Sequence, residues 1–186
     1  MEENMRKIIQ QMLKGEQVAF CESVQTELKA LAAEKEKALA SLQELFAESE
    51  KKKFDEIVEG WDKASAVAFE DYYGAGFVFG VLAGLETSGV FDKKYSVLYR
   101  VLSGRLTRES VGVSSDRERV AQNIRDNEKM IERFRGEKEE RFNDFYEFIG
   151  DIAALKEDEY LINGIRKGLL VGVCCADFLT EKASPV

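Results

Sequence analysis

Four basic residues in the second half of the chain have the spacing of one helix face. They are Arg117, Arg125, Lys129 and Arg133, which differ by multiples of four positions. Guanidinium groups can hold a phosphate or a carboxylate through two parallel hydrogen bonds. One interpretation is therefore a pocket for a nucleotide-like anion. The other is a solvated helix face, because acidic residues alternate with the basic ones at Asp126, Glu128 and Glu132.

Two acidic pairs each precede a tyrosine. They are Glu70-Asp71 before Tyr72 and Asp158-Glu159 before Tyr160. We expect these carboxylates to lie in the first turn of a helix, where negative charge complements the helix dipole. As a metal site they would offer only oxygen ligands. As an acid–base pair they lack any nucleophile or cofactor motif nearby.

Histidine is absent from all 186 residues. Its absence excludes Ser-His and Cys-His nucleophile pairs, a histidine general base and metal sites that contain histidine. The sequence also has no GxxxxGK[ST] loop and no GxGxxG after a strand, so phosphate-loop nucleotide binding has no support. We predict a protein without catalytic residues, metal or cofactor.

Glycines recur at every fourth position in two apolar segments. The first row is Gly76, Gly80 and Gly84, and the second is Gly164, Gly168 and Gly172. A glycine inside a helix costs about 1 kcal/mol relative to alanine, so a contact must offset it. We expect two helices to pack closely through these rows. The alternative is a flat surface on which a ligand or a partner helix lies.

The elements that must position these residues are helices. Pro185 is the only proline, so proline interrupts no helix before it. Apolar residues recur at spacings of three and four over 28–46 and over 54–72, which predicts two amphipathic helices with a charged corner at 48–53. A further helix over 70–86 is expected to end at Gly89, which suits a left-handed C-terminal cap.

The sequence repeats itself after 88 residues, where EDYYGAGFVFGVLAG (70–84) superposes on DEYLINGIRKGLLVG (158–172). We therefore predict an all-α protein of two tandem helical repeats, 1–90 and 91–186, packed about a pseudo-twofold. Each repeat is expected to hold a short helix and a long antiparallel helical hairpin. In the second hairpin, the first helix starts at Ser115, Gly136 marks the turn, and the returning helix runs from Glu137 past Tyr160.

The Y-x-x-x-G-F-x-x-G motif, its acidic pair and the earlier Leu13-Lys14-Gly15 resemble a family of small helical proteins of unknown function. That family is found mainly in clostridial-type bacteria and their mobile elements, and both halves look like its layout. The second half departs from the motif at Ile165, where the aromatic would be, and at Arg166-Lys167. The family has no established catalytic residue, so the resemblance implies a helical fold and nothing functional can be transferred from it.

The net charge of −8 opposes binding to nucleic-acid phosphates or to an anionic membrane. The longest uncharged apolar stretch, 72–85, is shorter than a membrane span, and the N-terminus lacks a signal peptide. Three cysteines without a disulfide framework fit a reducing cytoplasm. Two of them, Cys174 and Cys175, lie in an apolar run, which predicts buried and inert thiols.

We therefore expect a cytoplasmic, non-enzymatic protein that acts by binding another protein, and that can form oligomers. The acidic first half favours a partner with a basic surface, with an acidic partner surface at Asp55, Glu56, Glu59 and Asp62. The mobile-element resemblance favours an inhibitor of a host system, of which a nucleic-acid mimic is one form. The alternative is sequestration of a small phosphorylated or nucleotide ligand by the arginine-rich second half.

Overall fold

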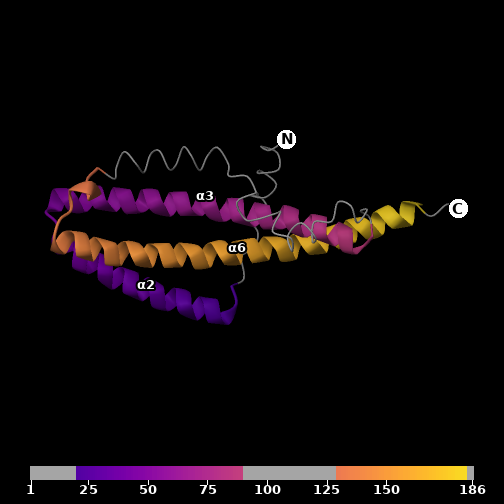
Figure 1. The fold of residues 1–186 in the computed structure, drawn as a ribbon, viewed down its shortest axis with the longest axis horizontal. Coiled ribbons are helices and arrows are strands. Elements are labelled where there is room, and N and C mark those ends of the chain that lie inside the picture. The colour runs from indigo at the N-terminus through magenta and orange to yellow at the C-terminus, as the bar shows by residue number, and fades with distance from the viewer. Residues whose placement is uncertain (1–19, 90–128, 184–186) are drawn as a thin grey trace. The chain divides into compact units, whose positions relative to one another are not determined.

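A computed structural model describes residues 20–89 and 129–183, with side chains up to residue 176. Every regular element in these ranges is a helix (Figure 1). The elements are α2 (Glu22–Gln43), α3 (Glu48–Thr87), the 3-10 helix η3 (Ile131–Arg133) and α6 (Glu137–Ala183). The prediction of an all-α protein is confirmed for the described part of the chain.

The chain divides into two compact units, and each contains residues from both halves of the sequence. We call the described residues 20–68 and 129–157 the aromatic unit, and the described residues 69–89 and 158–183 the glycine unit. The long helices α3 and α6 each contribute residues to both units. The two units are described separately below.

The corner between α2 and α3 lies at residues 44–47, earlier than predicted. The charged stretch 48–53 forms the first turns of α3, because Glu50 accepts a hydrogen bond from the backbone N–H of Ala47 at 3.0 Å. This contact satisfies a donor that the helix start leaves unpaired. The prediction of a corner at 48–53 is therefore wrong, and its charges begin a helix.

The helix α3 has 40 residues and includes both segments predicted at 54–72 and 70–86. It ends as predicted, since Gly89 has a φ of 78° and its N–H donates to the carbonyl of Glu86 at 3.0 Å. Because α3 and α6 are continuous, all four acidic residues of the predicted pairs lie inside a helix. The expectation that they occupy a first helical turn is wrong.

The core of the aromatic unit is built mainly from rings. Its buried residues are Leu42, Phe46, Phe54, Ile57, Trp61, Phe134, Phe142 and Phe145. Phe54 is fully buried, and its ring lies 5.2 Å from Phe46 and 5.7 Å from Phe145 between centroids. Separations of this size are favourable for tilted aromatic pairs. Phe134 enters the core two residues before Gly136, whose φ of 59° lets the chain turn into α6, as predicted.

Contacts between side chains give the helix directions within the aromatic unit. Glu50 and Phe54 of α3 meet Lys138 and Phe142 of α6 in the same order, so these two helices run parallel. Along the contacts of α2 with α3 and α6, the residue numbers of α2 decrease while those of the other helix increase. The helix α2 therefore runs antiparallel to both α3 and α6. Arg141 of α6 holds α2 by donating to the hydroxyl of Ser41 at 2.7 Å.

Candidate functional site

The glycines of α3 in the glycine unit lie against the backbone of α6. A methyl group added at Gly84 would lie 2.6 Å from the carbonyl oxygen of Leu169. At Gly76 and Gly80 the added methyl would clash with the carbonyls of Leu161 and Ile165. Real side chains do not approach a backbone so closely, so only glycine fits at these positions.

The glycines of α6 make the matching contacts on α3. Added methyl groups at Gly164, Gly168 and Gly172 would clash with the carbonyl oxygens of Tyr73, Phe77 and Val81. The numbers of contacting residues rise together on the two helices, so these segments also run parallel. The structure thus brings all six predicted glycines into one interface, and the opposing backbone occupies the space that a ligand on either row would need.

The predicted acidic surface lies on exposed positions of α3 in the aromatic unit. Asp55 accepts a hydrogen bond from Gln43 at 3.0 Å, and Lys35 lies 4.0 Å from Asp62. Lys63 pairs with Glu59 at 2.7 Å and lowers the pKa of that carboxyl. Glu56 alone has no such contact within the described ranges. Groups of the same chain therefore already engage most of this surface.

The predicted arginine row is only partly described. Arg117 and Arg125 lie outside the described residues. Lys129 lies in a turn and Arg133 is the last residue of η3, and both are exposed. Residues 129–133 form a turn and a 3-10 helix, so the α-helix predicted to carry the row does not extend over Lys129 and Arg133, and the anion-binding interpretation stays a prediction.

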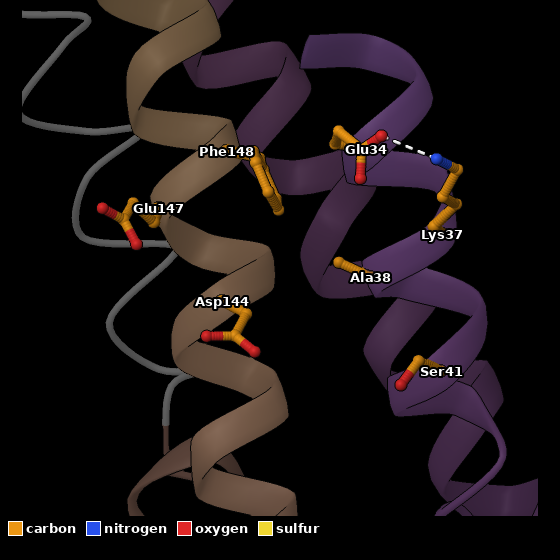
Figure 2. A pocket seen from close by; sticks show the side chains of 7 residues that line it. All are labelled: Glu34, Lys37, Ala38, Ser41, Asp144, Glu147 and Phe148. Atoms are coloured by element: carbon orange, nitrogen blue, oxygen red, sulfur yellow. Dashed lines mark hydrogen bonds and ion pairs between the residues drawn. The ribbon is translucent and has the colours of Figure 1, made fainter. Parts of the chain in front are cut away.

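An open groove of about 330 Å³ lies between α2 and α6 in the aromatic unit (Figure 2). It is lined by Glu34, Lys37, Ala38, Ser41, Asp144, Glu147 and Phe148. Lys37 is paired with Glu34 at 2.6 Å, whereas Asp144 and Glu147 have no ion pair within the described ranges. No group of three metal-ligating side chains occurs in the described part of the chain. The sequence analysis did not predict this groove. Its lining contains polar and charged side chains, but these do not form a recognisable catalytic arrangement.

A half-buried tyrosine marks the start of the glycine unit. The ring of Tyr160 stacks on Phe69 with centroids 5.2 Å apart. Burial, and then the negative charge of Glu70, raise the pKa of Tyr160. The neighbouring Glu159 is only 7% exposed. Tyr160 therefore stays protonated at neutral pH and acts as a packing residue.

Large apolar side chains of α6 in the glycine unit face outward. We call Ile162, Leu169, Leu170 and Val173 the α6 apolar face. Leu170 is 64% exposed, and the other three are 38% or 39% exposed. Cys174 and Cys175 are also exposed, so the prediction of buried thiols is wrong.

The glycine rows explain this exposure. Gly168, Gly172 and the fully buried Ala176 occupy the side of α6 that is covered, so larger residues between them must point elsewhere. The four-residue period of the glycines indicates by itself which side of α6 is buried. That period was therefore the sequence signal for the exposed face on the other side.

No helix in the described ranges combines the length and the apolar character that crossing a bilayer requires. Comparisons of the chain with protein-family models, curated proteins and solved structures find no match. The family resemblance noted from the motif remains a prediction.

Proposed function

We propose that this chain is a non-enzymatic helical protein that binds another protein through the α6 apolar face. The observation that carries the proposal is the exposure of this face, in which Leu170 is 64% exposed beside three further large apolar residues. Contiguous apolar surface of this kind is typical of protein-binding sites, whereas singly exposed apolar residues are ordinary.

The chemistry of the chain supports binding over catalysis, since histidine is absent. Three free cysteines are exposed, so we place the protein in the reducing cytoplasm, where such thiols persist. Inhibition of a host protein is the form of this function that the mobile-element resemblance favours.

The proposal includes an origin by duplication, with two tandem helical repeats related by a pseudo-twofold. Two core pairs of the aromatic unit join residues 88 positions apart, Phe46 with Phe134 at 5.5 Å and Phe54 with Phe142 at 6.3 Å between ring centroids. The residues with which the added methyl groups would clash show the same 88-residue relationship between α3 and α6. Tyr73 and Phe77, which oppose the α6 glycines, correspond to residues 161 and 165, which oppose the α3 glycines.

Affinity capture with matched variants tests the binding function. Purified protein should retain a host protein in a low-salt pull-down, and Leu170→Asp should lose it. Ala154→Asp is the control, because it adds the same carboxylate at an exposed position of α6 outside the face. Both variants should keep the circular dichroism spectrum of the parent. Equal retention by the parent and Leu170→Asp would contradict the proposal.

A further inference from the structure

We infer that the α6 apolar face takes an acidic amphipathic helix of a partner protein, with a partner carboxylate seated on Arg166. This inference rests on the proposed function and names the chemistry of its partner. It follows from the spacing of the exposed residues, from the single charge among them and from a comparison with the equivalent face of α3.

Four of the exposed residues form one stripe along α6, while Val171, Cys174 and Cys175 are exposed on other sides of the helix. Ile162, Arg166, Leu169 and Val173 follow one another at spacings of four, three and four, which places them on one side of a helix. Leu170 extends the stripe sideways. The glycines lie on a different side of α6 and pack against the backbone of α3. This packing fixes the side of α6 on which the stripe lies, relative to α3. A helix whose apolar residues recur at the same spacing would fit its ridges to this surface.

The charge of the stripe specifies the partner further. The segment 161–176 has no acidic residue, although the whole chain has a net charge of −8. Its only charges are those of Arg166 and Lys167. Arg166 is exposed, and no carboxylate in the described part of the chain pairs with it. A guanidinium group accepts a carboxylate through two hydrogen bonds, so a partner helix with a glutamate or aspartate beside its apolar stripe complements this face.

A second copy of the chain does not complement it. A symmetric contact would place two identical faces together, and the segment 161–176 of each copy has the same arginine and no acidic residue; the exposed Asp158, at the same spacing along the stripe, lies two helical turns before Arg166. The two guanidinium groups would then lose water without gaining a counter-charge, which is unfavourable. An acidic partner helix avoids this cost.

Arg166 also distinguishes the α6 face from its counterpart on α3. The position 88 residues earlier is Val78, which is 40% exposed. The counterpart of Leu170 is Leu82, which is half-buried. The equivalent surface of α3 therefore lacks both the charge and the most exposed apolar side chain. Val78 consequently offers a matched control at the corresponding position of the other helix.

Two fluorescent synthetic peptides test the inference. Both have leucines at alternating spacings of three and four, and their flanking positions are glutamates in one peptide and lysines in the other. Fluorescence anisotropy should show that the glutamate peptide binds the parent protein. Arg166→Glu and Leu170→Asp should each weaken this binding by about tenfold or more, and Val78→Glu should leave it unchanged. Arg166→Glu should in turn favour the lysine peptide.

The outcomes separate this inference from the proposed function. Equal binding of both peptides to the parent, or unchanged binding of the glutamate peptide to Arg166→Glu, would overturn the inference that the partner helix is acidic. If neither peptide binds while Leu170→Asp still loses its captured host protein, the inference fails and the proposed function stands. A dimer in sedimentation velocity that Leu170→Asp dissociates would make a second copy the occupant and overturn the inference.

Discussion

Glu50 of α3 and Lys138 of α6 lie 88 positions apart and form an ion pair, with 3.1 Å between Oε2 and Nζ. The ammonium of Lys138 also lies 4.8 Å from the ring centroid of Phe46, at a distance typical of cation–π contacts. Glu50 in addition caps the start of α3 through Ala47. Under the proposed duplication, one ancestral position has become acidic in one half and basic in the other, which gives a contact that two identical halves could not make.

Glu50 should make stability depend on pH in the acidic range. The hydrogen bond from Ala47, and then Lys138, lower the pKa of Glu50 from its ordinary value of 4.5. A lowered pKa in the folded state means that the stabilisation is complete above 4.5 and is lost as pH falls through the folded value. Glu50→Gln should therefore cost roughly 0.5–1 kcal/mol at pH 7 and almost nothing at pH 2, as measured by urea unfolding.

Glu56→Gln is the control for this measurement, because Glu56 is exposed on the same helix. Its unfolding curve should match that of the parent at both pH values. A loss of stability for Glu50→Gln that stays constant down to pH 2 would show that the carboxylate charge is not the cause.

The interface glycines should respond to alanine in the opposite way from two other helical glycines. Gly80→Ala and Gly168→Ala place a methyl group against the opposing backbone, so each should lower the free energy of unfolding by about 2 kcal/mol or more. Gly60 and Gly150 have no atom within 4 Å of an added methyl. Alanine at either position should raise stability by up to about 1 kcal/mol through helix propensity. Thermal unfolding that moves all four variants in the same direction would contradict this assignment.

Some features of the fold could be predicted from local sequence and others could not. Helical periodicity, the turn at Gly136 and the end of α3 near Gly89 depend on neighbouring residues, and the structure confirms them. The joining of 54–72 and 70–86 into one helix was missed, because overlapping apolar patterns do not reveal whether the chain bends between them. The exposure of Cys174 was missed because an apolar run does not show which of its sides is covered.

Removing the central ring of the aromatic unit should be strongly destabilising. Phe54 is fully buried and contacts the rings of Phe46, Trp61, Phe142 and Phe145. Phe54→Ala should cost about 3–5 kcal/mol, and Phe54→Leu about 1–1.5 kcal/mol, because leucine leaves a smaller cavity. The fluorescence of Trp61, the only tryptophan, reports unfolding directly in this core. Equal stabilities of the two variants would show that the site collapses around the missing ring.

Ionisation of Tyr160 should destabilise the folded protein at alkaline pH. Because burial raises its pKa above the ordinary value of 10, the neutral ring is favoured in the folded state. Its contribution is complete below pH 10 and is lost as pH rises through the folded value. Tyr160→Phe should therefore make stability less dependent on pH above 10. Glu70→Gln should shift the tyrosinate absorbance of Tyr160 toward lower pH, and an unchanged titration would exclude Glu70 as a cause.

The interface between the glycine rows also has a consequence during synthesis. Gly80 leaves the ribosome 88 residues before its counterpart Gly168, which is a delay of about 4–18 s at typical elongation rates. Throughout that interval the row on α3 lacks the α6 backbone against which it packs in the structure. An α6 surface that this row meets during that interval belongs to another chain, such as a neighbour on the same messenger RNA. Slow translation and crowded polysomes should therefore favour exchange of halves between chains, and dilution of nascent chains should favour the monomer.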